Sequence, residues 1–233
     1  MSTASRQISR LIIAAGLSVA AAGTGLAEDR LYPTGPPNGV AYLRFANLTG
    51  EPITISSGTA KISVPADDEQ RVRRYDPVTP GTELTATVQD GGAGKPVRIK
   101  LEQNELATIA VTAAPGGGVA TTTFREIPSD FNASKASLVL YNADESCKDG
   151  RLLAGDKDTV VISGVEPGKE GRRMVNPVNV ALRLSCGENA KVGAQLGSLA
   201  AGERYSVFAF AEPGKPHRAL ALRDEMGTLN PRQ

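Results

Sequence analysis

The chain has 233 residues, with 26 basic and 25 acidic side chains, 4% aromatic residues and no tryptophan. A chain so close to neutral lacks the basic surface of a nucleic-acid-binding protein, so we expect no nucleic-acid partner. The scarcity of aromatic rings also disfavours the stacking platform that dedicated sugar-binding modules use.

The N-terminal residues 1–27 have the pattern of a signal peptide. Arg6 and Arg10 precede an apolar run from Leu11 to Ala22, and residues 25–27 place small side chains at both recognition positions of a cleavage site. The apolar run is shorter than the about 20 residues that cross a bilayer, and no comparable run follows it. The sequence therefore predicts a periplasmic protein that does not itself span the membrane.

The remaining chain is a series of short β-type segments. Residues 28–39 are rich in proline, which predicts an extended N-terminal segment. Apolar alternation and β-branched residues then predict strands at 41–46, 53–56, 61–64, 83–88, 97–101, 107–112 and 119–125. Turn-rich breaks separate the strands, one of them at 76–81, and no stretch in this half has a convincing helical period. Regular short strands of this kind indicate an all-β sandwich or barrel.

The same pattern recurs after about 96 to 100 residues, a spacing typical of tandem small domains. Arg73-Arg74 before Pro77 corresponds to Arg172-Arg173 before Pro177, and residues 43–47 and 138–142 both end at an asparagine. We therefore predict two small Ig-like β-sandwich domains that arose by internal duplication. Their bounds are 40–128 and 136–225, with a linker at 129–135 and a frayed tail at 226–233.

The stretch from Gly171 to Cys186 joins an arginine pair to an alternating segment. From Val178 onward apolar and polar residues alternate, which predicts one half-buried strand. The arginines are interpreted first as outward-facing strand residues. The alternative is a partner-docking role, because arginine makes forked contacts with carboxylates. On that alternative the candidate interface residues are Tyr32, Arg172, Arg173, Met174 and Asn176.

Cys147 and Cys186 are the only cysteines. Export places them in an oxidising compartment, so a disulfide between them is the simplest interpretation. Closing a loop of about 40 residues would stabilise the fold by about 3–4 kcal/mol if the effect is mainly on the entropy of the unfolded chain.

The residues that usually carry catalysis or metal binding do not form a familiar set. His217, the only histidine, is interpreted as a solvated loop residue. The sequence has no Gly-x-Ser-x-Gly elbow, and one histidine with two distant cysteines cannot supply the usual zinc ligands. Acidic clusters at 67–69 and 156–158 lack the spacing of a calcium loop. The sequence therefore predicts no catalytic residue, no metal site and no cofactor.

Two motifs, LYPTGP at residues 31–36 and NPVNVAL at residues 176–182, make the chain resemble the alginate biosynthesis protein AlgF family. The resemblance covers nearly all of the chain beyond the signal peptide. It implies a two-domain β protein of the periplasm, which links a membrane-bound O-acyltransferase to periplasmic acetyltransferases during O-acetylation of an exported polysaccharide. In this picture the protein is an adaptor and not the catalyst. The polymer stays open between alginate, cellulose and another exopolysaccharide.

Two other functions also stay open at this point. One is an acetyl carrier or transferase that acts through a serine or threonine hydroxyl without a known motif. The other is a structural or adhesive cell-surface protein, because tandem sandwiches are frequent there and a fold alone does not set function.

Overall fold

The computed structural model describes residues 39–128, 132–187, 191–212 and 214–228. All regular elements in these ranges are β-strands, which confirms the prediction of an all-β fold. The same ranges contain no helix long and apolar enough to cross a membrane. The predicted signal peptide and Tyr32 lie outside the described residues.

The first half of the fold consists of two four-stranded sheets that pack as a sandwich. Inner sheet 1 has the order β4-β1-β7-β8, with β1 at Ala41–Asn47, β4 at Asp76–Val78, β7 at Leu106–Ala113 and β8 at Val119–Glu126. Outer sheet 1 has the order β3-β2-β5-β6, with β2 at Ile53–Ser57, β3 at Ala60–Val64, β5 at Glu83–Gln89 and β6 at Lys95–Lys100. Both sheets contribute to one apolar core, which includes Ile53, Val88 and Ile109.

The second half contains an equivalent pair of sheets. Inner sheet 2 has the order β12-β9-β17-β18, with β9 at Ala136–Asn142, β12 at Glu170–Val175, β17 at Arg204–Phe210 and β18 at Arg218–Arg223. Outer sheet 2 has the order β11-β10-β14-β15, with β10 at Gly150–Ala154, β11 at Thr159–Val165, β14 at Leu182–Cys186 and β15 at Lys191–Ala194. A small ladder pairs β13 (Val178–Asn179) with β16 (Ser198–Leu199). Leu138, Leu184 and Val207 belong to the core of this sandwich.

The strand order of the second sandwich repeats that of the first, strand for strand. Each inner sheet also contains one parallel pair, β1 with β7 and β9 with β17. Asn47 and Asn142 end the equivalent strands β1 and β9 and make matching contacts. The Nδ2 of Asn47 donates to the carbonyl oxygen of Val64 (3.0 Å), and that of Asn142 donates to the carbonyl oxygen of Val165 (2.8 Å). This agreement supports an internal duplication.

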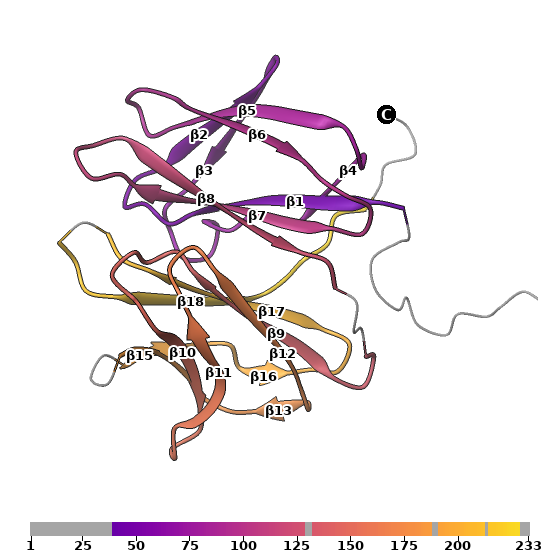
Figure 1. Cartoon of the computed structure of the whole chain (residues 1–233), viewed down its shortest axis with the longest axis vertical. Coiled ribbons are helices and arrows are strands. Elements are labelled where there is room, and N and C mark those ends of the chain that lie inside the picture. The colour runs from indigo at the N-terminus through magenta and orange to yellow at the C-terminus, as the bar shows by residue number, and fades with distance from the viewer. Residues whose placement is uncertain (1–38, 129–131, 188–190, 213, 229–233) are drawn as a thin grey trace, which may run out of the picture. The chain divides into compact units, whose positions relative to one another are not determined.

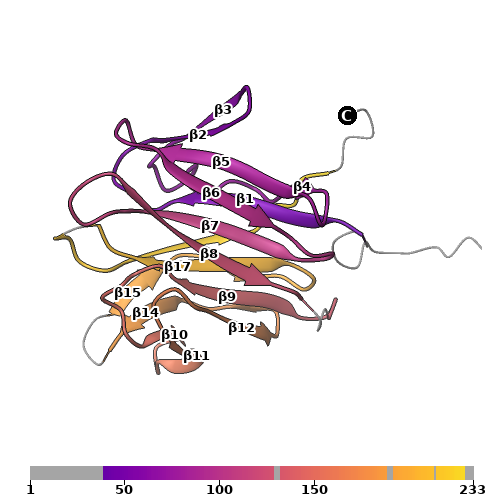
Figure 2. The same ribbon diagram turned by 45° about the horizontal axis from the view of Figure 1, so that its top comes forward.

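The two inner sheets pack against each other through a further apolar core. Ala46, Ala110 and Phe124 from inner sheet 1 share this core with Tyr141 and Phe208 from inner sheet 2. Figures 1 and 2 show β1, β7 and β8 lying beside β9, β17 and β18. The sheets therefore stack in four layers, and each inner sheet is covered on both faces. This is why every residue of β9 is buried, as expected for a strand with no solvent face.

The turn predicted at 76–81 is wrong in its first three residues. Asp76–Val78 forms β4, in which Asp76 lies opposite Leu43 and Val78 lies opposite Ala41 of β1. Pro77 made this segment look like a turn. The strand accepts it because β4 is at the edge of inner sheet 1, where a missing N–H removes no ladder hydrogen bond.

The stretch from Gly171 to Cys186 is also more divided than predicted. The single strand expected from Val178 is split into β13 and β14, and the burial alternates as predicted only from Leu182 to Leu184, since Ser185 is buried as well. The arginine pairs correspond less closely than their sequence suggests. Ala41 lies opposite Val78 and its equivalent Ala136 lies opposite Val175, so Arg172-Arg173 takes the place of Tyr75-Asp76.

The C-terminal segment returns to the first sandwich. Met226 forms an isolated parallel bridge with Tyr75. The N–H of Tyr75 donates to the carbonyl oxygen of Glu225 (2.8 Å), and the N–H of Gly227 donates to that of Tyr75 (2.7 Å). Residues 226 and 227 thus belong to the fold, although the sequence predicted a frayed tail from residue 226.

Candidate functional site

A cluster of charged and hydroxyl-bearing side chains lies in the contact between the two inner sheets. This buried charge cluster consists of Arg44, Tyr75, Thr108, Glu126, Tyr141, Arg204, Ser206 and Asp224. Nη1 of Arg44 lies 2.7 Å from Oδ1 of Asp224, and both side chains are 0% exposed. The other guanidinium nitrogens of Arg44 donate to Thr108 (2.9 Å) and Ser206 (2.7 Å). Because Arg44 belongs to the first sandwich and Asp224 to the second, this ion pair joins the two.

Arg204 and Glu126 make a second charged link across the same contact. Nη2 of Arg204 lies 2.5 Å from Oε1 of Glu126, and Nε of Arg204 lies 2.8 Å from Oδ2 of Asp224. Tyr141 donates to Glu126, and its hydroxyl lies 3.2 Å from that of Tyr75. The guanidinium carbon of Arg44 also lies 4.1 Å from the centre of the Tyr75 ring, within cation–π range.

The charges of the cluster stabilise one another. Burial by itself would raise the pKa of Asp224, but the positive charges of Arg44 and Arg204 outweigh it and lower that pKa below its ordinary value. Burial, followed by the negative charge of Glu126, raises the pKa of Tyr141 well above its ordinary value. The tyrosine therefore stays neutral and can donate its hydrogen bond. Since the cluster has little solvent contact and its members come from both inner sheets, it is suited to hold the two sheets together.

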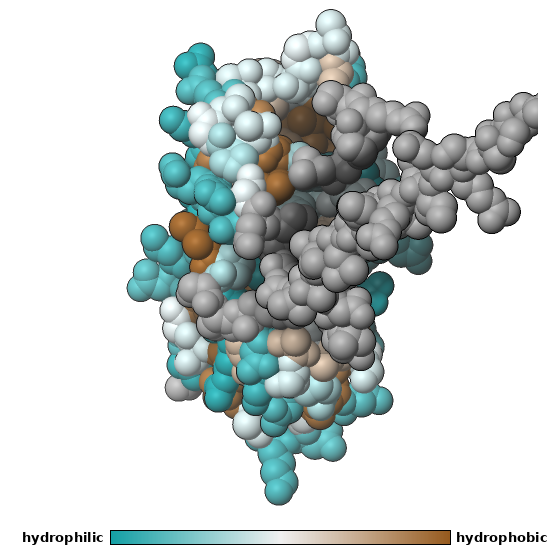
Figure 3. All heavy atoms as spheres, turned by 90° about the vertical axis from the view of Figure 1, so that its right-hand side faces the viewer, coloured by the Kyte–Doolittle hydropathy of each residue, from teal (hydrophilic) through white to brown (hydrophobic). Residues whose placement is uncertain are grey.

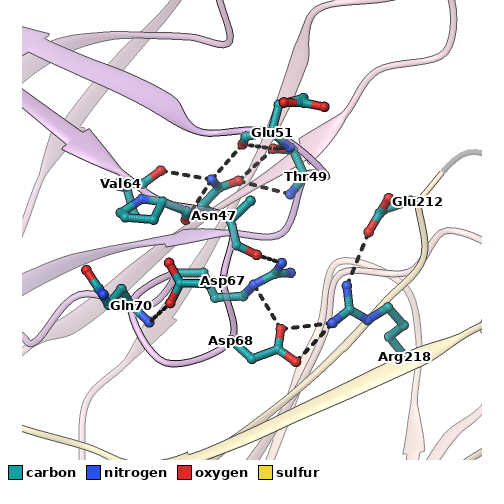
Figure 4. A network of polar contacts seen from close by, with 12 residues as sticks. Asn47, Thr49, Glu51, Val64, Asp67, Asp68, Gln70, Glu212 and Arg218 are labelled. Atoms are coloured by element: carbon teal, nitrogen blue, oxygen red, sulfur yellow. Dashed lines mark hydrogen bonds and ion pairs between the residues drawn. The ribbon is translucent and has the colours of Figure 1, made fainter.

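A second polar link joins the sandwiches nearer the surface (Figure 4). Nη2 of Arg218 lies 2.8 and 3.0 Å from the two carboxylate oxygens of Asp68, and Nη1 lies 3.2 Å from Glu212. The ring of Phe210 lies near two guanidinium groups, those of Arg71 at 5.3 Å and Arg218 at 5.0 Å from its centre. This link binds the segment after β3 to the start of β18.

His217 has a defined partner, contrary to its interpretation as a solvated loop residue. Its Nδ1 lies 2.7 Å from Oδ2 of Asp144, a carboxylate whose side chain is 2% exposed. The Ser146 hydroxyl donates to Oδ1 of the same carboxylate (2.5 Å). Burial alone would raise the pKa of Asp144, but the hydrogen bonds from Ser146 and His217 outweigh it and lower that pKa.

The geometry around Asp144 differs from that of a serine hydrolase. In such a triad the serine donates to the histidine, whereas Ser146 donates to the carboxylate. A side-chain atom of Cys186 lies within 4.8 Å of those of Asp144 and His217, as in a three-ligand metal group. Its sulfur is bonded to Cys147 with an S–S distance of 2.00 Å, so it offers no thiolate. The predicted disulfide is confirmed.

The predicted interface residues on β12 make contacts within their own sandwich. Nε of Arg172 donates to the Ser137 hydroxyl (3.0 Å), and Nη1 of Arg173 donates to the carbonyl oxygen of Val161 (2.9 Å). The Asn176 side chain accepts a hydrogen bond from Lys135 (2.6 Å). Arg172 and Met174 therefore lie on one face of β12, with Nη2 of Arg172 3.6 Å from Sδ of Met174, whereas Arg173 points to the other face and Asn176 follows the strand. Their role in partner binding stays a prediction.

The exposed surface offers few apolar groups. Figure 3 shows a face on which hydrophilic residues predominate and hydrophobic ones form small groups. The large apolar side chains that are exposed in the described residues are Ile62, Ile127, Val160, Val178 and Met226. A shallow, open hollow of about 300 Å³ lies over outer sheet 1 and is lined mainly by Ser56, Thr85, Thr87 and Arg98.

These features define a class of protein: two duplicated β-sandwiches joined through a shared core that contains a buried charge cluster. The sequence model of the family described as "Alginate O-acetyl transferase AlgF" matches residues 14–206. The chain therefore belongs to the AlgF family.

The similar relatives all carry the name "Alginate biosynthesis protein AlgF". The protein of Pseudomonas putida is 29% identical over 194 residues, which covers 83% of each chain. That of Pseudomonas aeruginosa is 29% identical and covers 88% of this chain and 89% of its own. That of Azotobacter vinelandii is 27% identical over 81% of this chain and 78% of its own. The similarity thus extends over most of the sequence.

Proposed function

We propose that this chain is a non-enzymatic periplasmic adaptor in the O-acetylation of an alginate-like exported polysaccharide. In this role it holds a membrane-bound O-acyltransferase and periplasmic acetyltransferases in one assembly. The names of the family and of its relatives support the connection to alginate and to acetyl transfer.

The single observation that favours an adaptor is the position of the buried charge cluster, which is the most elaborate group of polar side chains in the described residues. The buried charge cluster joins the two sandwiches, and its charged side chains are at most 14% exposed. An enzyme needs its perturbed acids and bases at a place where substrate can reach them. Here the perturbed groups instead fix the orientation of the two sandwiches relative to each other. An adaptor that binds two partners needs such a fixed orientation.

Genetic deletion and co-purification test this proposal. Deletion should leave polymer production intact and remove most of its acetylation, and the wild-type gene should restore it. The tagged chain should co-purify both the acyltransferase and an acetyltransferase from detergent-solubilised cells. The proposal fails if acetylation persists in the deletion strain and neither component co-purifies.

A second candidate function is acetyl transfer through a hydroxyl, and the description of the family as a transferase favours it. Ser146 is the hydroxyl to examine, because it shares the carboxylate of Asp144 with His217. Intact-mass measurement after incubation with an acetyl donor would show an added acetyl group in the wild type and none in Ser146→Ala. For an adaptor we expect no adduct, and Ser146→Ala should support polymer acetylation as well as the wild type.

A further inference from the structure

The two sandwiches differ at one pair of equivalent edge strands. β3 is the edge of outer sheet 1, and β11 is the corresponding edge of outer sheet 2. β11 packs against β12 of the neighbouring sheet, whereas β3 has no comparable contact with β4. The cause is the length of the neighbour, since β12 spans Glu170–Val175 and β4 only Asp76–Val78. The duplication thus provides an internal comparison of a covered edge with an open one.

The apolar side chains at these edges differ accordingly. Ile162 of β11 is 7% exposed, while Ile62 of β3 is 39% exposed. Gly171 of β12 lies so close to Ile162 that an added Cβ would come within 2.8 Å of its methyl group. Ile62 has no such cover, and the four residues Ala60–Ser63 are all exposed. On the side of β3 that faces the sandwich core, the position beside Ile62 is therefore not covered by a neighbouring strand.

Side chains also form hydrogen bonds with backbone groups of β11. Arg173 donates to the carbonyl oxygen of Val161 (2.9 Å), and Asp149 accepts from the N–H of Gly164 (3.2 Å). A register irregularity in the pairing of β10 with β11 further interrupts this edge. Bulges and capped backbone groups of this kind are ways in which proteins prevent strand addition.

The backbone of β3 is not protected in this way. Ser57 lies opposite Ala60 across a two-residue turn, and such a closing pair is hydrogen-bonded. Ladder hydrogen bonds alternate, so Ala60, Ile62 and Val64 direct their backbone groups toward β2. Those of Lys61 and Ser63 point to the open side. Among the described residues, no side chain or loop hydrogen-bonds them there.

The charges around β3 indicate what kind of segment would fit. Lys61 is the charged residue at an outward-facing position of β3, and the neighbouring strand β2 has no charged residue, whereas Arg98 and Lys100 face the same side from β6 at the opposite edge of the sheet. Opposite charges on neighbouring strands attract, and like charges repel. An added strand would therefore favour acidic side chains on the solvent face and an apolar side chain over Ile62.

We propose that β3 accepts an extended, acidic segment of a partner protein as an additional strand of outer sheet 1. This inference rests on the proposed adaptor function and gives it a place on the molecule. Backbone hydrogen bonds to Lys61 and Ser63 would supply affinity, while Lys61 and Ile62 would select the sequence, as in other cases of strand addition.

A peptide experiment tests the surface directly. The mature chain is titrated with a synthetic peptide of alternating glutamate and valine, and amide exchange is followed by NMR. The exchange of the Lys61 and Ser63 amides should slow by about tenfold or more, because they gain acceptors. An alternating lysine–valine peptide serves as the control and should have no effect. Unchanged exchange with the acidic peptide, or protection elsewhere only, would overturn the proposal.

Substitutions test it in the complex. Ser63→Pro removes the open N–H, and Arg98→Pro is the matched control on the opposite edge, where Pro96 already occupies the alternate position. Co-purification of the acetylation components should be lost in the first variant and kept in the second. If Ser63→Pro does not fold, Lys61→Glu should weaken binding, whereas Lys157→Glu in the equivalent hairpin should not.

The remaining outcomes separate this inference from the function on which it rests. If components co-purify equally well with Ser63→Pro and Lys61→Glu, the β3 site is wrong and the adaptor function stands. If nothing co-purifies with the wild type, the adaptor function fails, and the peptide titration alone decides the site. A dimer that forms through β3, or amides of β3 that become exposed only when residues 28–38 are deleted, would assign the edge to the chain itself and overturn the proposal.

Discussion

The guanidinium group of Arg44 and the carboxylate of Asp224 lie 2.7 Å apart, and both side chains are 0% exposed. Their positions are separated by 180 residues, one in the first strand of the first sandwich and the other after the last strand of the second. Breaking such a pair leaves an uncompensated charge in the protein interior. The relative placement of the two sandwiches is therefore coupled to the stability of each.

Replacing Arg44 by methionine should destabilise the protein strongly. Asp224 would keep Arg204 as a partner but lose its closest ion pair, and Thr108 and Ser206 would lose a donor. We expect the free energy of unfolding to fall by about 3–5 kcal/mol, as for other broken buried pairs. Urea denaturation followed by circular dichroism measures it.

The control for this prediction is the double variant Arg44→Met with Asp224→Leu. It removes both charges, so its loss of stability should be smaller than that of Arg44→Met alone. A single variant as stable as the wild type, or a double variant less stable than the single, would contradict the role assigned to the pair.

High pH should unfold the protein through its buried tyrosines. Burial raises the pKa of both Tyr75 and Tyr141 above the ordinary value of 10.0. The folded state thus favours the neutral phenol, and this contribution to stability is complete below the unfolded pKa. As the pH rises above about 10, the unfolded state releases phenolic protons more readily, so stability falls.

Urea midpoints measured at pH 8, 9, 10 and 11 check this dependence. The wild type should lose stability mainly above pH 10. Tyr141→Phe should be less stable at pH 8, because Glu126 and Arg204 lose a hydrogen-bond partner, yet it should lose less between pH 10 and 11. The explanation is wrong if the two proteins show the same alkaline loss.

The strand pattern of the sequence predicted the all-β fold, but it did not predict that the two inner sheets pack against each other. The alternation of residues 41–46 correctly predicts a strand, and it places Tyr42, Arg44 and Ala46 on one face of β1. An arginine in that row looks like a solvent-facing residue, whereas all three residues are buried and Arg44 contacts Ser206 and Asp224 of the second sandwich. A clue was present, since apolar neighbours on both sides of a lone charge are unusual for a solvated face. The partner of that charge lay too far along the chain for a pattern to reveal it.

Other predictions were wrong because the residues that decide the local structure are close in space but not in the sequence. Pro77 concealed β4, because an edge strand tolerates what a central strand does not. The contact of His217 with Asp144 joins two loops 73 residues apart. The disulfide was predictable, since only two cysteines exist and both could be assigned from composition.

The asparagines that end β1 and β9 should contribute equally to the two sandwiches. Nδ2 of Asn47 donates to the carbonyl oxygens of Glu51 and Val64, and Nδ2 of Asn142 donates to those of Cys147 and Val165. An alanine would leave buried carbonyl groups unsatisfied, at about 1–3 kcal/mol for each variant. Asn179→Ala, at an exposed position, is the control and should change stability by less than about 0.5 kcal/mol.

Chemical denaturation of Asn47→Ala, Asn142→Ala and the control measures this symmetry. Comparable losses in the first two would agree with duplicated roles. A large loss in one variant and none in the other would mean that only one copy of the contact still stabilises its sandwich.

Removing the disulfide should weaken the second sandwich without changing its fold. Cys147 and Cys186 are 39 residues apart and connect the loop after β9 to the end of β14. Restricting a loop of this length stabilises a protein by about 3–4 kcal/mol in the chain-entropy description, so the variant Cys147→Ala with Cys186→Ala should lose about that much. Thermal and urea denaturation of oxidised, reduced and doubly substituted protein measure it. Agreement between the reduced and substituted forms is expected, because both lack the covalent link. Equal stability of all three would show that the hydrogen bonds of Asn142 and Asp144 hold this loop without the disulfide.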